Sequence, residues 1–266
     1  MARNTGATDA RIRQHILGEV GWNVRRVGEE MHGEIALVPE LLVPGTPHLR
    51  TGMMAAWADQ LMGLLAVQIM APRVPTTLEL DVHLYRPAPG SGTVYGKSRL
   101  IKRGRTVSVA VCAFYDQHGD VFAEGAGSFM LAGDPDVRLP PSLSIDLPRF
   151  STRLERPIAE RARCTVRGPG VATIPLHEDA LNAANTLNGG LLAIAVEEAV
   201  LSLCPGDTLS SLGLRYLRPV RIGPAVANAR LQHGLSLVDL HDEGNDNRLS
   251  VTATARTFTQ PFTQPR

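Results

Sequence analysis

The chain has 266 residues, 44% of them hydrophobic, which is enough to bury one large core or two cores of ordinary size. Its formal net charge of +1 gives no reason to expect nucleic acid as a partner. Its three cysteines lack CxxC spacing and its polar N-terminus lacks the apolar run of a signal peptide, so we predict a soluble, cytoplasmic protein of enzyme size.

The first predicted element is an amphipathic helix over Asp9–Glu29, inside an N-terminal helical segment of residues 1–31. Its apolar side chains recur at helical spacing: Ile12, Ile16, Leu17 and Val20. A strand-like run, HGEIALVPELL, then opens a unit of residues 32–133.

A long apolar helix follows in the stretch RTGMMAAWADQLMGLLAVQIMAPR, residues 50–73. Between its flanking arginines it holds one acid, Asp59, and two glutamines, which is typical of a soluble core helix, so we expect no membrane insertion. An isolated carboxylate among apolar side chains favours a cavity or an interface. The alternative is an acid that is solvated or paired with Arg50 or Arg73.

The strands after this helix have a counterpart later in the chain. LDVHLYRPAPGSG (80–92) and LGLRYLRPVRIG (212–223) share an alternating run that ends in Arg-Pro before a Gly-bearing turn. Each follows an apolar helix with a central acid and precedes two further β-rich runs. Three elements in the same order indicate an internal repeat.

The repeat fixes the predicted organisation. The four prolines of the stretch LAGDPDVRLPPSLSIDLPRF favour an extended linker over residues 134–159, followed by a second unit of residues 160–259 and a tail of residues 260–266. Each unit reads as a strand, a long helix and about four strands. A curved antiparallel sheet that wraps the helix buries it best, so the expected class is α+β, with two such sheets in one chain.

These features resemble the hotdog fold of acyl-CoA thioesterases, and most closely the phenylacetate-pathway type. That pattern has Asn, then His-Gly-Gly six residues later, then an acid eight residues past the first Gly. The stretch NAANTLNGGLLAIAVEE fits it with Asn182, Asn188 in the His place, Gly189, Gly190 and Glu197. The first copy fits less well but keeps its acid, Asp59, at the same spacing. The resemblance implies a tandem double hotdog that forms its own pseudo-dimer.

In the resembling family each site lies between two hotdog units. Carried over by position, site one takes residues from both halves: Asp59, Thr77, Asn182 and Gly189. Site two keeps its acid, Glu197, but has Leu209, Pro44 and Thr51 where the motif residues belong. We therefore expect one working site per chain, with Glu197 in a second, degenerate one as a polar remnant or an interfacial hydrogen-bonding group.

The residue chemistry fits attack on a thioester. Asp59 would act as general base for water or as the direct nucleophile on the acyl carbon. The helix start at Gly189 and Gly190 would offer free N–H groups to the developing oxyanion, or would be only a tight turn. Asn182 would hold water or the acid, or shape a turn. Thr77 would orient the carboxylate, with Thr76 as a rival.

Substrate contacts are the least specific predictions. Met53 and Trp57 would line an acyl cavity, although both are equally ordinary core residues. The basic run KSRLIKRGR, with Arg103 and Arg105, would hold the phosphates of coenzyme A, or serve solubility alone. The scattered histidines lack metal-ligand spacing, so we expect no metal and no cofactor beyond coenzyme A as part of the substrate.

The leading hypothesis is hydrolysis of an acyl-CoA to a free acid and coenzyme A. A hotdog hydratase or dehydratase is one alternative, although it needs a His at the site, where Asn188 stands. A non-catalytic acyl-CoA-binding protein is the other. Exposed sheet edges leave a homo-oligomer of double-hotdog protomers open.

Overall fold

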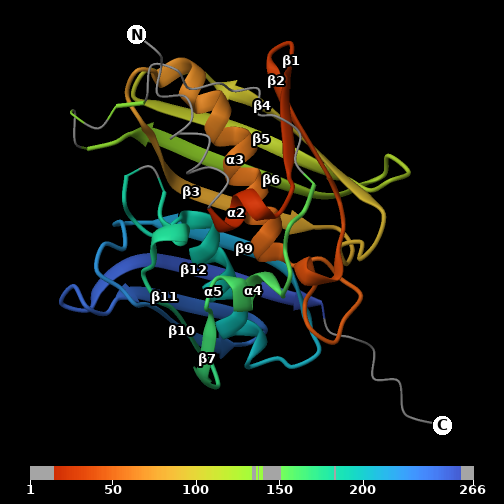
Figure 1. Ribbon diagram of the computed structural model, residues 1–266, viewed down its shortest axis with the longest axis vertical. Helices are drawn as coiled ribbons and strands as arrows, with labels where there is room; N and C mark the ends of the chain where they lie inside the picture. Colours follow the sequence, from red (N-terminus) through yellow and green to blue (C-terminus); the bar gives the residue numbers. More distant parts are fainter. Residues whose placement is uncertain (1–14, 134–135, 137, 140–150, 183, 259–266) are drawn as a thin grey trace.

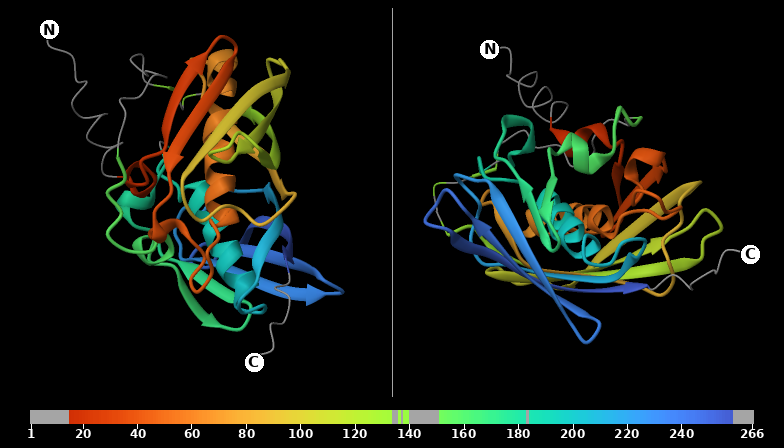
Figure 2. Two further views of the ribbon diagram at one scale, coloured as in Figure 1. Left: turned by 90° about the vertical axis from the view of Figure 1, so that its right-hand side faces the viewer. Right: turned by 90° about the horizontal axis from the view of Figure 1, so that it is seen from below.

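The computed structural model describes residues 15–133, 136, 138–139, 151–182 and 184–258. One antiparallel sheet of 12 strands forms a single layer, and the two long helices lie on its concave face (Figures 1 and 2). The strand order is β1-β2-β4-β5-β6-β3-β9-β12-β11-β10-β8-β7.

The first half contains α2 (Ile16–Glu19), β1 (Asn23–Val27), β2 (Glu30–Ala36), the 3₁₀ turn η1 (Pro39–Leu41), α3 (Thr51–Met70), β3 (Pro75–Leu84), β4 (Thr93–Lys102), β5 (Val107–Tyr115) and β6 (Val121–Leu131). Buried and exposed positions alternate along β4, as the period of two in a strand with one covered face requires. The predicted order of strand, long helix and four strands is confirmed.

The second half repeats this order with α4 (Ile158–Arg161), β7 (Thr165–Gly168), β8 (Val171–Ile174), η2 (Glu178–Ala180), α5 (Gly189–Leu201), β9 (Thr208–Tyr216), β10 (Ala225–Gln232), β11 (Leu235–Asp242) and β12 (Arg248–Phe258). The strands of the two halves follow one permutation, β2-β4-β5-β6-β3 in the first and β8-β10-β11-β12-β9 in the second. The tandem repeat inferred from the sequence is therefore present in the fold.

The two expected sheets are joined into one. Strand β3 pairs with β9 in antiparallel register, with Leu80 opposite Leu214 and Val82 opposite Leu212. Arg215 on β9 also reaches Asp81 on β3, with 3.0 Å between Nη1 and Oδ1. Because the two halves meet at these central strands, their helices lie next to each other over the same sheet (Figure 2).

Helix α3 is long and apolar enough to cross a membrane by length and composition, yet most of it is buried in the core of this fold. It packs against α5 at a very close approach. A Cβ built on Gly190 would lie 2.6 Å from the Cβ of Ala56, so a side chain larger than hydrogen does not fit there. These small residues bring the starts of the two helices into the interface between the halves.

The helix predicted over Asp9–Glu29 is wrong in the part that the structure describes. Only Ile16–Glu19 is helical; Gly21 then takes a φ of +81°, which ends the helix, and β1 begins at Asn23. Residues 9–14 lie outside the described part. Strand β1 forms because Trp22 and Val24 alternate inward, with the Trp22 ring stacked on that of Trp57 at 4.6 Å between centroids.

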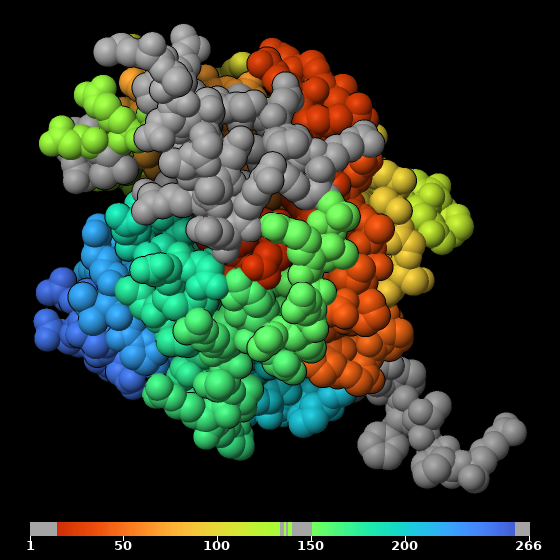
Figure 3. Space-filling model, in the orientation of Figure 1, coloured from red at the N-terminus to blue at the C-terminus, as the bar shows by residue number. Residues whose placement is uncertain are grey.

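The predicted linker is described only in part, because residues 134–135, 137 and 140–150 lie outside the described residues. Its last part, from residue 151, lies beside α2 on the face shown in Figure 3, and Ile158–Arg161 forms the short helix α4. There Arg161 donates two hydrogen bonds to the Glu19 carboxylate, at 2.8 and 2.7 Å. This contact ties the start of the second half to the N-terminal turn of the first.

Candidate active site

Asp59 lies in the third turn of α3, where its carboxylate meets the start of strand β3. The Thr77 hydroxyl donates a hydrogen bond to Asp59 Oδ1 at 2.6 Å. Burial raises the pKa of Asp59 to about 6, and the hydrogen bond from Thr77 opposes that rise. The structure thus joins the acid and the threonine that the sequence predicted for one site, and Thr76 instead bonds the backbone oxygen of Met130.

The start of α5 supplies the second part of the site. Asn188 is the N-cap, and its Oδ1 accepts the N–H of Gly190 at 2.8 Å. The N–H of Gly189 has no partner among the described residues, and it stands at the positive end of the helix dipole. Of the two glycine N–H groups that the sequence suggested, only that of Gly189 is therefore open to a ligand.

Tyr216, at the end of β9, links these two parts and was not identified from the sequence. Its hydroxyl donates to the backbone oxygen of Gly189 at 3.1 Å, and a Cβ at Gly189 would lie 3.2 Å from its ring. Burial, and then the charge of Asp59, raise the pKa of Tyr216 well above its ordinary value. The close approach of Ala56 to Gly190 brings the helix that carries Asp59 to the α5 start. The available signal was Tyr216 standing where the first copy has Leu84.

Asn182, the fourth residue predicted for site one, is used by its own loop. Its Oδ1 accepts the N–H groups of Ala184 and Thr186 at 2.9 and 3.2 Å, and its Nδ2 donates to the Thr186 hydroxyl at 2.8 Å. No hydrogen bond joins Asn182 to Asp59 among the described residues. The turn role that the sequence left open is thus present, and a catalytic role for Asn182 stays a prediction.

The equivalent place in the other half is filled by Glu197 from α5. Its Oε1 accepts the N–H of Thr51 at the start of α3, at 2.8 Å, and Gly52 donates a further backbone hydrogen bond. Arg50 pairs with Glu197 at 3.4 Å and with Glu198 at 2.6 Å, and both Arg50 and Glu197 are fully buried. Site two is therefore closed by the protein's own carboxylate.

The acids of the two sites, Asp59 and Glu197, differ in length by one methylene group, and the longer one closes its site. Glu197 reaches the start of the opposite helix, whereas the shorter Asp59 is held by Thr77. Leu209 stands in the Thr77 place and contributes only its backbone oxygen, which accepts from the Thr51 hydroxyl at 3.0 Å. Site two also demonstrates that this kind of helix start binds a carboxylate oxygen, here from within the chain.

The residues predicted to bind substrate lie mainly elsewhere. Met53 and Trp57 are buried core side chains, and Trp57 packs on Trp22. Arg103, at the β4–β5 turn, pairs with Glu29 at 3.0 Å, and Arg105 is exposed. The core alternative is thus the one seen for Met53 and Trp57, and the phosphate role of the two arginines stays a prediction.

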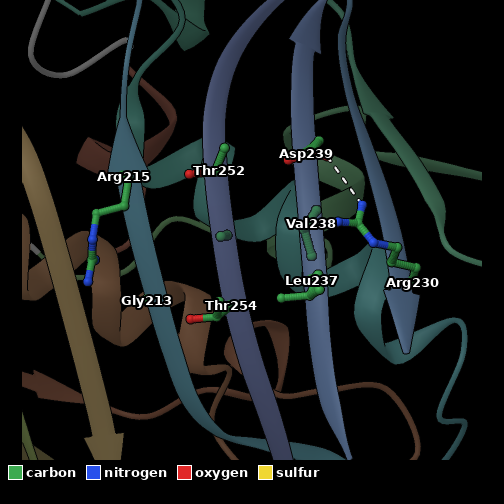
Figure 4. A pocket seen from close by; sticks show the side chains of 9 residues that line it. Gly213, Arg215, Arg230, Leu237, Val238, Asp239, Thr252 and Thr254 are labelled. Carbon is green, nitrogen blue, oxygen red and sulfur yellow. Dashed lines mark hydrogen bonds and ion pairs between the residues drawn. The ribbon is translucent and has the colours of Figure 1, made fainter. Parts of the chain in front are cut away.

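A shallow groove lies on the outer face of the second half, on the side of the sheet away from the helices (Figure 4). It is lined by small and polar residues of β9, β12, β11 and β10: Gly213, Arg215, Thr252, Thr254, Leu237, Asp239 and Arg230. It contains none of the residues predicted for the site.

Replacing Gly190 by Ala should destabilise the protein, because the new methyl group collides with Ala56 on α3 and pushes the two helices apart. Overpacking of this kind costs about 1–3 kcal/mol. Urea unfolding of Gly190→Ala beside Gly63→Ala measures the cost. Gly63 also lies in a helix without a positive φ, and a Cβ there meets only the Phe129 ring at 3.6 Å, an ordinary contact, so the control lacks the collision and adds no backbone strain. An equal loss in both variants would contradict the close approach.

Comparison with known proteins supports the arrangement. The family model of the thioesterase superfamily matches residues 47–123, from the loop before α3 to the start of β6. A search of curated protein sequences found no match. An acyl-ACP thioesterase from Bacteroides thetaiotaomicron superposes with a TM-score of 0.63 at 11% identity, over 86% of this chain and 98% of that one.

The 12:0-ACP thioesterase from Umbellularia californica also superposes with a TM-score of 0.63, at 12% identity, over 89% of this chain and 100% of that one. At such identities the likeness establishes the fold, and it extends over both halves. Together with the repeated strand order, it shows that the chain has a tandem double-hotdog fold, and the stretch around Asp59 in its first half matches the thioesterase superfamily.

Proposed function

We propose that the protein hydrolyses acyl-CoA thioesters to a free acid and coenzyme A, at one composite site between its halves. The observation that carries this proposal is the Asp59–Thr77 pair beside an α5 start whose Gly189 N–H has no partner among the described residues. Thioester hydrolysis needs a base or nucleophile and a donor for the oxyanion, and this site supplies one of each.

In the proposed reaction Asp59 acts in its ionised form. Water attacks the acyl carbon while Asp59 takes its proton, or Asp59 itself attacks and water then releases the acid. In either case the carbonyl oxygen gains negative charge, which the Gly189 N–H and the α5 dipole stabilise. With a pKa of about 6, Asp59 is largely ionised at pH 7 and still basic enough to accept a proton. No cofactor is required.

Coenzyme A is proposed as the carrier because cations lie at the same end of the sheet as Thr77. Thr77 stands opposite Phe129 on β6, and Phe129 stands opposite Ser108 at the start of β5. The β4–β5 turn with Arg103 and Arg105 therefore lies at that end, where it would meet anionic phosphates. Free cysteines throughout the described chain suit a reducing cytoplasm, where we place the activity.

The hydratase alternative lacks its base in this structure. Among the described residues no histidine contacts Asp59, and His48, shortly before the start of α3, bonds the backbone oxygen of Ala88 at 2.9 Å. A non-catalytic binding protein would keep the helix start but would not need a carboxylate with a raised pKa. Hydrolysis uses both features.

The proposal is tested by thiol release from a panel of acyl-CoA substrates of increasing chain length, with the same acyl groups on acyl carrier protein as a second panel. Preferential turnover of acyl-CoA is the expected result. Turnover of the carrier-protein panel alone would show that the substrates are acyl carrier protein thioesters and would leave the hydrolysis reaction unchanged. Absence of thiol release from both panels would contradict hydrolysis, and tight acyl-CoA binding without turnover would favour the binding protein.

Replacing Thr77 by Val should weaken the reaction without abolishing it. Loss of the 2.6 Å hydrogen bond removes a contact that lowers the pKa of Asp59, so that pKa rises above about 6. The acidic limb of the pH–rate profile should move to higher pH, with a loss of about 10- to 100-fold at pH 7, which is what one charge-assisted hydrogen bond accounts for. Thr76→Val is the matched control, and an equal shift in both would contradict the assignment.

A further inference from the structure

Strand β5 is apolar on both of its faces. Ser108, Ala110, Cys112 and Phe114 face the core, and the outward set is Val107, Val109, Val111, Ala113 and Tyr115. An antiparallel strand with one face in water normally alternates apolar with polar residues, and an apolar run on both sides is typical of a strand that is covered on both sides. The outer face of β5 is therefore an apolar surface on which no other described part of the chain packs.

The second half does not repeat this pattern, although its fold does. The pairing registers place Leu235 and Leu237 of β11 where β5 has Val109 and Val111, but Asp239 and His241 where β5 has Ala113 and Tyr115, so the outward apolar run stops halfway along β11. The outer face of the second half also carries threonines on β12 and arginine on β10 (Figure 4). The apolar stripe is therefore a property of the first half and not a requirement of the hotdog strand order.

Opposite charges flank the stripe. Lys97 on β4 stands opposite Ala113 from one side, and Glu124 on β6 stands opposite Ala113 from the other. Both charged side chains are exposed, and Lys97 lies over the Tyr115 ring, with 4.9 Å to its centroid. One strand spacing is about 4.8 Å, so a cation and an anion stand symmetrically about the central line of β5.

We propose that two copies of this chain dimerise through the outer face of the first half, with β5 stacked on β5 and a two-fold axis lying in the interface parallel to that strand. Such an axis exchanges the two sides of the stripe while it keeps position along the strand. Lys97 is then brought over the partner's Glu124, and Glu124 over the partner's Lys97. Val109, Val111 and Ala113 meet their own copies on the axis.

The curvature of the sheet supports stacking with the strands aligned, and the charges then select the axis. The sheet bends around its helices across the strands, so its outer face is convex in that direction (Figure 2). Two convex faces of this shape touch over the greatest length when their strands run nearly parallel, which is the aligned mode of sheet packing at about 10 Å. An axis across the strands would instead place Lys97 near its own copy and add repulsion.

A second copy suits this surface better than an unrelated partner, because the surface is complementary to itself. An apolar line with a cation on one side and an anion in the same row on the other needs no further chain to satisfy its charges. The inference is independent of the proposed reaction, since no residue of site one lies on this face.

Sedimentation velocity of the full chain across micromolar concentrations tests the proposal. Wild type should sediment as a dimer, and Lys97→Glu and Glu124→Lys should each weaken it, raising the dissociation constant about tenfold or more by like-charge contact. Mixing these two variants should restore the dimer, because each then faces an opposite charge across the axis. Arg230→Glu, a matched reversal on the outer face of the second half, should leave the dimer intact.

Each other outcome overturns the proposal. A monomeric wild type would show that the stripe has no second copy as its partner. A dimer insensitive to both reversals would place the interface elsewhere. Two weakened variants that fail to associate on mixing, with circular dichroism showing both folded, would exclude this two-fold axis.

Discussion

Asp59→Asn lowers kcat for thioester hydrolysis by about 10²–10⁴-fold, the range expected for loss of a positioned base. The amide can still accept the hydrogen bond from Thr77, so the local geometry is kept while the proton acceptor is removed. In wild type the rate should fall as the pH drops through about 6, because Asp59 then becomes protonated. Thiol release across pH 5 to 8 measures both effects.

The stability of Asp59→Asn provides a control with the opposite sign. The folded-state pKa of Asp59 is raised from 3.8 to about 6, so its contribution to stability is present below pH 3.8 and is lost as the pH rises through 6. Asn does not ionise, so the thermal midpoint of the variant relative to wild type should increase between pH 4 and pH 8. A variant that is inactive because it has lost its fold would instead show a decrease in thermal midpoint relative to wild type at every pH.

Glu197→Gln is the matched variant at the equivalent position of the other half. Gln can still accept the N–H of Thr51 and has nearly the shape of Glu, so it keeps site two closed. Thioester hydrolysis by this folded variant should stay close to wild type. A loss as large as that of Asp59→Asn would contradict the account of one working site.

Arg50→Met should be among the most destabilising single changes in the chain. Arg50 and Glu197 are fully buried, and removal of the arginine leaves a buried carboxylate without its cation. Breaking a buried ion pair from one side costs about 3–5 kcal/mol. Arg230→Met, which breaks an exposed pair with Asp239, should cost about 1 kcal/mol or less. Urea unfolding of the two variants gives the comparison.

The double variant Arg50→Met with Glu197→Gln separates the charge from the packing. Gln keeps a hydrogen-bond acceptor for the Thr51 N–H but brings no charge into the interior. The double variant should therefore be more stable than Arg50→Met alone, with a coupling energy obtained from the double-mutant cycle. Additive losses would indicate that Arg50 stabilises the interface by packing alone.

Much of the fold could be predicted because the sequence contains the same order of elements twice. The Arg-Pro strand ends and the two helices with central acids recur in order, and their repetition carried the double-hotdog inference. The Asp59–Thr77 contact was predicted from the resemblance to the hotdog thioesterases, carried over by position, and the structure contains it. The pairing of β3 with β9 did not follow, because the sequence of an edge strand does not specify its neighbour.

The failures have physical causes as well. The N-terminal periodicity of Ile16 and Val20 was extended past Gly21, where the backbone turns and a strand begins. Trp57 was predicted to line an acyl cavity, but its ring is covered by Trp22, which is distant in the sequence. Tyr216 was missed because many residue types fit its position in a strand. Its role at the site is visible only from its hydrogen bond to the Gly189 backbone oxygen.

The central claim is that one of the two pseudo-equivalent sites is open and that the other is closed by Glu197. Calorimetric titration of the chain with a non-hydrolysable thioether analogue of an acyl-CoA substrate tests this claim most directly. The account predicts one analogue bound per chain, with the same stoichiometry in Glu197→Gln. Two analogues per chain in wild type would contradict the closure of site two, and binding that survives a bulky Gly189→Trp change would place the site away from the α5 start.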